Sequence, residues 1–376
     1  MTVKTEEFFK NAFNLGINYY TGVPDSLLKD FCGFASDNLP KSSHQIAANE
    51  GSALSLGIGY HLSTKKIPLI YFQNSGLGNV INPLLSLADE DVYSIPLLMS
   101  IGWRGEPEVR DEPQHVKQGK VMLAMLDAMD ITYFKISNDT DSAIKDLEKA
   151  YNYAKKYSKP VALIVSKGIF SEYKRKVDTP FVNSVKRIDA INLVLKELPK
   201  DTIFVSTTGY TSRELFYARE INNESHQRDF MLVGGMGHAI SVATGIRHGG
   251  FAGPVCCLDG DGSFLMHMGS SAVTILEGVK GITHVLFNNG MHESVGGQPT
   301  IANELQIESI ASNFGYKLSK TCNELGGVRN FFSEINIFES NFLEIKCSPS
   351  EIVNLPRPTE TPLDSKTNFI QGIIEP

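Results

Sequence analysis

Two polar turns follow apolar runs in the second half of the chain, and their residue types suit a metal ion and a phosphate. Gly260-Asp261-Gly262-Ser263 comes after the run 254–258, and Asn288-Asn289 ends the run 283–288. An Asp oxygen and an Asn oxygen, with a backbone carbonyl, two phosphate oxygens and a water, complete an octahedron for Mg²⁺. Backbone N–H groups of a glycine turn at a helix start bind phosphate. By itself, Gly-Asp-Gly is equally typical of a tight turn.

Glu50 is the most unusual residue of the first half. It stands in H-Q-I-A-A-N-E-G-S-A-L-S-L-G (44–57), and every residue three or four positions away is Ala, Ile or Leu. A helix there buries a carboxylate without a basic neighbour on its own face. Burial of an unpaired charge costs several kcal/mol, so such a group is usually paired, protonated or used. Glu50 therefore contacts either a ligand or a distant backbone N–H or arginine.

Both halves alternate short apolar runs with helical patterns. Further runs lie at 67–73, 95–101, 160–166, 202–206 and 342–346, and helical patterns include 120–129 and 141–154. This alternation predicts an α/β fold in which two mostly parallel sheets have helices on both faces. Such sheets bind ligands beyond the carboxyl ends of their strands, where the polar turns stand. The charged stretch 171–180 predicts a linker, and we expect domains at 1–172 and 187–376 with a linker at 173–186.

Composition limits the possible partners and compartments. The formal net charge is −7 and no Lys/Arg run is present, which argues against a nucleic-acid partner. The five cysteines are odd in number and form no C-x-x-C pair, so we expect reduced thiols and a cytoplasmic protein. The first residues lack a signal-peptide core, and no apolar stretch approaches about 18 residues. We therefore expect no membrane association.

The spacing of the two polar turns matches a known cofactor signature. Between Gly260-Asp261-Gly262 and Asn288-Asn289 lie 25 residues, and the sequence thereby resembles the thiamin-diphosphate-dependent decarboxylases. Within them it is similar to the phosphonopyruvate decarboxylases and their sulfopyruvate relatives. Motifs along nearly the whole chain carry the resemblance: Y-T-G-V-P-D-S-L-L (20–28), A-A-N-E-G-S-A (47–53), S-G-L-G-N (75–79), I-G-W-R-G-E-P (101–107), D-E-P-Q-H-V-K-Q-G (111–119), T-T-G-Y-T-S-R-E-L (207–215), G-G-M-G-H-A (234–239) and N-G-M-H-E-S-V-G-G-Q-P-T (289–300).

The resemblance implies a pyrimidine-binding first domain and a diphosphate-binding second domain. Larger relatives have a third domain between them, and the linker here is too short to hold one. The implied Mg²⁺ ligands are Asp261, Asn289 and the carbonyl of Met291. The residues implied to contact the diphosphate and the thiazolium are Thr207, Thr208, Gly209, Gly235, Met236, Gly262 and Ser263. For Met236, ordinary core packing is the alternative interpretation.

For Glu50, the resemblance implies a hydrogen bond to N1′ of the aminopyrimidine, which activates the cofactor for loss of its thiazolium C2 proton. Ser75, Gly76 and Asn79 are implied to lie over the pyrimidine. In this family the active site lies between the first domain of one subunit and the second domain of another. The resemblance therefore implies a homodimer or a larger homo-oligomer.

The implied reaction is the decarboxylation of a small anionic 2-oxo acid. For phosphonopyruvate the products are CO₂ and phosphonoacetaldehyde, and the alternative is sulfopyruvate or another acidic 2-oxo acid. A phosphonate needs cations or N–H donors, and we expect Arg104 and His44 to contact the substrate. His292 and Glu293 are expected to be catalytic. Weaker candidates are Arg110, His115, Lys117, Asp259 and Glu214. A non-catalytic binding protein is a third reading, against which intact Glu50, Asp261 and Asn289 argue.

Overall fold

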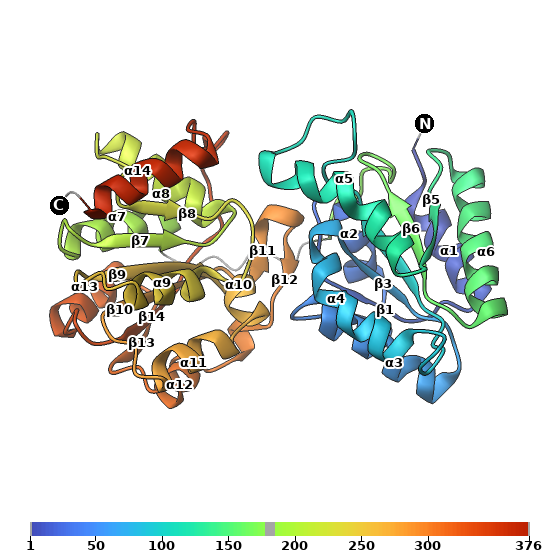
Figure 1. Cartoon of the computed structure of the whole chain (residues 1–376), viewed down its shortest axis with the longest axis horizontal. Coiled ribbons are helices and arrows are strands. Elements are labelled where there is room, and N and C mark those ends of the chain that lie inside the picture. The colour runs from blue at the N-terminus through green and yellow to red at the C-terminus, as the bar shows by residue number, and fades with distance from the viewer. Residues whose placement is uncertain (1, 177–184, 375–376) are drawn as a thin grey trace. The chain divides into compact units, whose positions relative to one another are not determined.

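A computed structural model describes residues 2–176 and 185–374. The chain divides into two compact units, Met1–Lys176 with Ser294–Gln298 and Val177–Glu293 with Pro299–Pro376. Each unit is built on a six-stranded parallel sheet (Figure 1). Most of the predicted linker, at 177–184, lies outside the described residues, and the predicted domain boundaries stay a prediction.

The sheet of the first unit has the strand order β2-β1-β3-β4-β6-β5. Its strands are β1 (Tyr20–Gly22), β2 (His44–Ile46), β3 (Leu69–Gln73), β4 (Leu98–Gly102), β5 (Thr132–Lys135) and β6 (Val161–Val165). Its helices are α1 (Thr5–Leu15), α2 (Lys29–Asn38), α3 (Glu50–Thr64), α4 (Leu77–Pro83), α5 (Pro113–Ala128) and α6 (Thr140–Tyr157).

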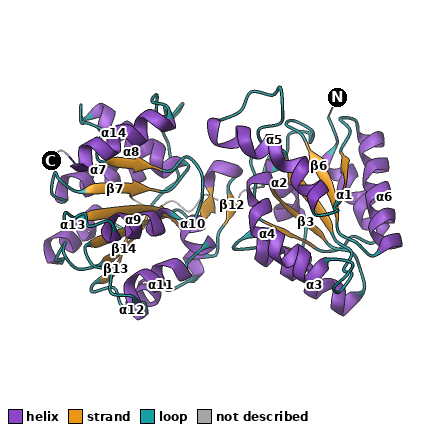
Figure 2. Cartoon of the chain, in the orientation of Figure 1, coloured by secondary structure: helices purple, strands orange, loops and turns teal. Residues whose placement is uncertain are grey.

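Helices cover both faces of this sheet because its central strands are apolar on both sides. Along β3, Leu69 and Tyr71 pack into a cluster with α1, α2 and α6. The alternate residues Ile70 and Phe72 pack into a second cluster with α3, α4 and α5. Figure 2 shows the strands between these two layers of helices. The prediction of helices on both faces is thereby confirmed.

The second sheet has the order β13-β14-β10-β9-β7-β8. Its strands are β7 (Ile203–Ser206), β8 (Asp229–Met231), β9 (Val255–Gly260), β10 (Ile282–Asn288), β13 (Ser319–Cys322) and β14 (Asn341–Lys346). The short strands β11 (Met291–His292) and β12 (Gln298–Pro299) form a separate two-stranded sheet. The helices are α7 (Arg187–Glu197), α8 (Tyr210–Ile221), α9 (Ala239–His248), α10 (Asp261–Met266), α11 (Gly269–Leu276), α12 (Ile307–Asn313), α13 (Leu325–Glu334) and α14 (Pro362–Ile374).

The two units share one strand order when their strands are counted along the chain: 2-1-3-4-6-5. In both units the strand order reverses direction between the first and third strands, which are β1 and β3 in the first unit and β7 and β9 in the second. Ligands of open α/β sheets bind beyond the carboxyl ends of strands at such a point. All seven predicted strands are present. Among the described residues, no helix is long and apolar enough to cross a membrane.

Candidate active site

Glu50 lies at the first position of α3, beyond the carboxyl end of β2. The helix starts there because the side chain of Asn49 accepts a hydrogen bond from the backbone N–H of Ser52 at 2.9 Å. Glu50 is only 6% exposed. Its Oε2 accepts a hydrogen bond from Nδ2 of Asn79 at 2.7 Å, and no hydrogen bond to its Oε1 is present among the described residues. One carboxylate oxygen is thus anchored by the protein and the other is free for a ligand.

Gly76 lies directly against Glu50. A Cβ on Gly76 would lie 2.5 Å from Cγ of Glu50 and closer still to its Oε1, so any side chain here would displace this carboxylate. Ser75 is exposed next to it, where its Oγ accepts a hydrogen bond from Nε2 of Gln73 at 2.5 Å. The structure therefore brings together Glu50, Ser75, Gly76 and Asn79, although their roles toward a cofactor stay predictions.

Arg104 follows the neighbouring strand β4 and is largely occupied within the protein. Its Nε donates to Oδ2 of Asp111 at 2.8 Å, its Nη2 donates to Oδ1 of Asp111, and its Nη1 donates to Oγ of Ser26 at 2.8 Å. The Arg104 guanidinium in turn lowers the pKa of Asp111, although burial of Asp111 opposes this shift. Because Asp111 neutralises its charge, Arg104 anchors the loop 104–111, and its contact with substrate remains a prediction.

Asp25 is a functional candidate that sequence reasoning missed. It follows β1 and is 1% exposed, and no side chain of the described residues bonds its carboxylate oxygens. Burial raises its pKa to about 6, although the backbone N–H of Leu27 and, less strongly, the charge of Arg104 act in the opposite direction. Its motif Y-T-G-V-P-D-S-L-L was visible in the sequence, but burial of the side chain was not.

The other basic candidates of this unit lie in different settings. His44 is buried at the start of β2, where its Nε2 bonds Oη of Tyr71 at 2.8 Å, and burial lowers its pKa to about 4. The structure thus gives this neutral ring a partner in the core and does not bring it to Glu50 through any described contact. Arg110 and Lys117 are exposed, whereas burial lowers the pKa of the half-buried His115.

In the second unit, the carboxyl ends of β7, β9 and β10 lie side by side, and each carries predicted residues. Asp261 directly follows β9, is 4% exposed, and accepts a hydrogen bond from Oγ1 of Thr300 at 2.5 Å. Burial raises the pKa of Asp261 to about 6. A nearby cation would favour its ionised form. Thr300 was missed as a site residue, although it closes the motif 289–300.

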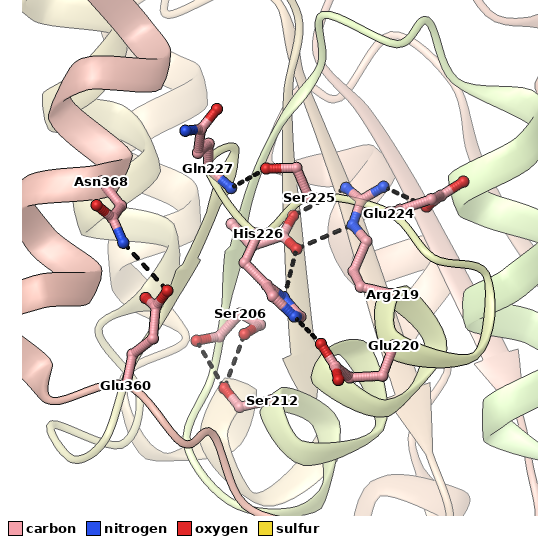
Figure 3. A network of polar contacts seen from close by, with 11 residues as sticks. Ser206, Ser212, Arg219, Glu220, Glu224, Ser225, His226, Gln227, Glu360 and Asn368 are labelled. Carbon is pink, nitrogen blue, oxygen red and sulfur yellow. Dashed lines mark hydrogen bonds and ion pairs between the residues drawn. The ribbon is translucent and has the colours of Figure 1, made fainter.

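A wall of hydroxyl and backbone groups faces this turn. Oγ of Ser263 accepts hydrogen bonds from Oγ1 of Thr207 at 2.9 Å and from the backbone N–H of Gly237 at 3.0 Å. Ser212 ties the start of α8 to the end of β7, because its Oγ bonds Oγ of Ser206 and the Thr207 carbonyl, both at 2.7 Å; the Ser206 contact is drawn in Figure 3.

Glycines shape the same wall at two positions. Gly209 has φ 97° and Gly235 has φ 63°, a region that side chains rarely adopt. Thr208, between Thr207 and Gly209, is half-buried. The contact of Thr208, Gly209 and Gly235 with a diphosphate stays a prediction.

The two asparagines at the end of β10 have separate environments. Asn288 donates through Nδ2 to Oε1 of Glu344 on the neighbouring strand at 2.6 Å. Asn289 donates through Nδ2 to Oε2 of Glu293 at 2.8 Å, and its Oδ1 accepts from the backbone N–H of Met291 at 3.2 Å. Asn288 is the last residue of β10 and is bound within the sheet, whereas Asn289 follows the strand and stays the predicted metal ligand.

The predicted residues His292 and Met236 meet at Gly262. A Cβ on Gly262 would lie 2.8 Å from Cε1 and Nδ1 of His292 and 3.2 Å from Cε of Met236. Burial lowers the pKa of His292 to about 4, so its ring is neutral at physiological pH. The side-chain-free backbone of Gly262 thus lies between a thioether and a neutral imidazole.

Glu293 and Glu214 share a partner that sequence reasoning missed. Both carboxylates bond the guanidinium of Arg187 at the start of α7. Arg187 is 27 residues from Glu214 and 106 residues from Glu293 in the sequence, so no local pattern predicted these pairs. Asp259 points elsewhere: its Oδ2 lies 3.4 Å from Nε2 of His284, and its Oδ1 accepts from the N–H of Gly260 at 2.9 Å.

The donor set of the second unit fits Mg²⁺ bound to a diphosphate. Asp261 and Asn289 offer hard oxygen ligands at adjacent strand ends, as this ion prefers. The hydroxyl of Ser263, which accepts from Thr207 and Gly237, keeps its own hydrogen to donate to a phosphate oxygen, and the glycine backbone offers further donors. Glu50 in the first unit offers a dry carboxylate with one free oxygen.

Comparison with known proteins agrees with this chemistry. Residues 8–131 match the model of the thiamine pyrophosphate enzyme N-terminal TPP binding domain. Residues 208–326 match the corresponding C-terminal TPP binding domain.

Among curated proteins, the phosphonopyruvate decarboxylase of Streptomyces viridochromogenes is 28% identical, and the alignment covers 96% of this chain and 93% of that protein. The sulfopyruvate decarboxylase of Methanosarcina acetivorans is 25% identical, with 94% and 93% covered. The sulfopyruvate decarboxylase subunit alpha of Methanocaldococcus jannaschii is 30% identical, with 42% of this chain and 89% of that subunit covered.

The chain belongs to the thiamine pyrophosphate enzymes. Within them it is a decarboxylase of the group that contains the phosphonopyruvate and sulfopyruvate decarboxylases, and thiamin diphosphate is its cofactor. The family resemblance, fold class and cofactor predicted from the sequence are confirmed.

Proposed function

We propose that this decarboxylase converts 3-phosphonopyruvate to phosphonoacetaldehyde and CO₂ with thiamin diphosphate and Mg²⁺. The observation that carries the proposal is the full-length match to proteins named phosphonopyruvate decarboxylase. Besides the 28% identical relative, one from Streptomyces hygroscopicus is 26% identical over 100% of this chain. Sulfopyruvate is the alternative substrate, because relatives of that name also match. The presence of both halves in one chain does not distinguish the two substrates, because the sulfopyruvate decarboxylase of Methanosarcina acetivorans is also matched over 94% of this chain.

The residues of the second unit hold the cofactor in this proposal. Asp261, Asn289 and the carbonyl of Met291 would bind Mg²⁺, and Ser263 and Thr207 would hold the diphosphate. The bound cofactor supplies an electron sink for the loss of CO₂ from a 2-oxo acid. Met236 would pack against its thiazolium ring, as an apolar side chain beside Gly262 is able to do.

In the first unit, Glu50 would share a proton with N1′ of the aminopyrimidine through its free Oε1. Asn79 holds the other oxygen, which restricts rotation of the carboxylate. The neutral ring of His292 is a candidate to orient the substrate carboxylate. Asp25, whose pKa is about 6, is a candidate to hold a proton near neutral pH.

We further propose a homodimer or larger homo-oligomer in which different subunits contribute the two halves of each site. Relatives named as separate subunits support it. The alpha subunit from Methanocaldococcus jannaschii matches 42% of this chain and the beta subunit 35%, so in that organism the two parts are separate chains. None of the five cysteines forms a disulfide in the described residues, which agrees with a cytoplasmic location.

The decisive experiment offers purified protein phosphonopyruvate, sulfopyruvate and pyruvate with thiamin diphosphate and Mg²⁺. Phosphonoacetaldehyde is detected by ³¹P NMR, and CO₂ is measured for all three substrates. We expect the highest kcat/KM for phosphonopyruvate. A higher kcat/KM for sulfopyruvate would establish the alternative, and turnover of pyruvate alone would contradict both.

A further inference from the structure

A buried arginine lies behind the predicted metal ligands. The Arg187 side chain is 5% exposed, and that of Glu214 is 1% exposed. Nε and Nη2 of Arg187 donate to the two oxygens of Glu214 at 3.1 and 3.0 Å, and Nη2 also donates to Oε2 of Glu293 at 2.9 Å. Burial alone would lower the pKa of Arg187, but the two carboxylates raise it, so the cation is permanent.

Glu293 connects this arginine to Asn289. Oε2 of Glu293 accepts hydrogen bonds from Nη2 of Arg187 and from Nδ2 of Asn289 at 2.8 Å. Oε1 of Glu293 accepts from the backbone N–H of Ser350 at 2.7 Å. Both oxygens of Glu293 therefore accept hydrogen bonds from protein donors, which fixes the position of the carboxylate.

The contact with Glu293 decides which way the Asn289 amide points. A carboxylate accepts hydrogen bonds and cannot donate them, so Nδ2 must face Glu293 and Oδ1 must face away. Oδ1 uses one lone pair for the N–H of Met291, and a second lone pair stays available. The reverse orientation would turn an NH₂ group toward the position of the metal, where it cannot act as a ligand.

We propose that Arg187 and Glu293 are positioning residues of the metal site, which fix the Asn289 amide so that Oδ1 is presented to Mg²⁺. This inference rests on the proposed function, because it takes Asn289 as the ligand. Arg187 holds the Glu293 carboxylate in place through the hydrogen bond from its Nη2. Glu293 then acts on the metal through Asn289 and not on the substrate.

The experiment measures Mg²⁺ affinity by calorimetry on metal-free, full-length protein with saturating thiamin diphosphate and no substrate. Arg187→Met and Glu293→Gln are each expected to weaken Mg²⁺ binding about 10- to 100-fold, as loss of groups that orient metal ligands typically does. Glutamine has one acceptor oxygen, so in Glu293→Gln an NH₂ faces either Ser350 or the Asn289–Arg187 side.

Arg219 provides a matched control. Like Arg187, it is paired with two carboxylates: Asp229, through Nε and Nη2 at 2.9 Å each, and Glu224, through Nη1 at 2.7 Å. Figure 3 shows this network around α8 and the loop before β8. Arg219→Met is expected to change Mg²⁺ affinity less than twofold. An equal loss in Arg219→Met and Arg187→Met would reduce Arg187 to a general stabiliser and overturn the proposal.

Asn289→Asp separates amide orientation from packing, because a carboxylate presents oxygen to the metal in either orientation. In this background Glu293→Gln is expected to leave Mg²⁺ affinity unchanged or to raise it, since glutamine can donate to Asp where glutamate repels it. The same fold-loss from Glu293→Gln in both backgrounds would overturn the proposal. These two variants carry the test even where Arg187→Met does not fold.

The parent protein separates this inference from the proposed function. If it binds Mg²⁺ with thiamin diphosphate but does not convert phosphonopyruvate, the proposed substrate is wrong and the metal result still stands. If it takes up no Mg²⁺ in the presence of thiamin diphosphate, the positioning role is overturned.

Discussion

Gly76→Ala tests whether the position of the Glu50 carboxylate governs turnover. The backbone of Gly76 has φ −82° and ψ −4°, which alanine adopts readily, so the substitution acts only through its methyl group. That methyl would lie 2.5 Å from Cγ of Glu50. To reach an ordinary carbon–carbon separation of about 3.5–4.0 Å, the glutamate must shift by about 1 Å. The shift also disturbs the bond to Asn79.

The expected loss follows from that displacement. A misplacement of about 1 Å in a reacting geometry costs on the order of 10²-fold in rate. We therefore expect kcat for phosphonopyruvate to fall about 100-fold. The overpacking should lower the free energy of unfolding by about 1–3 kcal/mol. Affinity for thiamin diphosphate should stay within about threefold, because the proposed diphosphate and metal contacts lie in the second unit.

Gly78→Ala is the matched control two residues further along the chain. Gly78 is exposed in α4, and a Cβ there has no heavy atom within 4 Å in the described residues. Its kcat should equal that of the parent protein, and the helix should gain about 0.5–1 kcal/mol of stability. Steady-state kinetics, calorimetry with thiamin diphosphate and urea unfolding decide the outcome. Parental kcat in Gly76→Ala, or equal losses in both variants, would refute the reasoning about Glu50.

Three further predictions concern other residues of the site. Asp261→Ala should abolish Mg²⁺-dependent retention of thiamin diphosphate without unfolding the protein, and unchanged cofactor affinity by calorimetry would remove Asp261 from the metal site. Arg104→Ala should raise KM for phosphonopyruvate by a factor equivalent to about 2–5 kcal/mol and raise KM for pyruvate much less; equal losses, with a lower Tm, would assign Arg104 to anchoring the loop through Asp111. Burial raises the pKa of Asp25 to about 6 in the folded protein, whereas the same carboxyl in the unfolded chain loses its proton near pH 4. Between about pH 4 and 6 the folded state therefore binds more protons than the unfolded state, and the free energy of unfolding should fall as the pH rises, by up to about 3 kcal/mol. Asp25→Asn should therefore be more stable than the parent in urea unfolding at pH 7, with a difference that shrinks toward pH 4; a difference independent of pH would contradict this assignment.

The strand ends that carry the site were predictable because their signals are local. Gly260-Asp261-Gly262 and Asn288-Asn289 each adjoin a continuous apolar run, and such runs are typical of buried parallel strands. The strands missed from the sequence lack that signal. β5 (Thr132–Lys135) and β8 (Asp229–Met231) lie at sheet edges and are only partly buried, whereas β1 (Tyr20–Gly22) is buried but has only three residues, one of them glycine.

The partners of the site residues were beyond reach for a different reason. Asn79 is 29 residues from Glu50, and Arg187 is 106 residues from Glu293, so only the folded chain shows these pairs. Glu50 therefore has no basic partner on its own helix, as predicted, but Asn79 from a distant part of the sequence bonds one of its oxygens. For Arg104 the sequence indicated an available cation, whereas the structure pairs it with Asp111, seven residues on.

One strand order thus supports two different electrostatic environments. At the carboxyl edge of the first sheet, Glu50 is held by a neutral amide, and no side chain of the described residues bonds the Asp25 carboxylate. At the same edge of the second sheet, Glu214 and Glu293 are both paired with the buried Arg187. A heterocyclic ring that must gain and lose protons suits the first environment, and a diphosphate with its metal suits the second. The division follows from where each sheet places a compensating arginine.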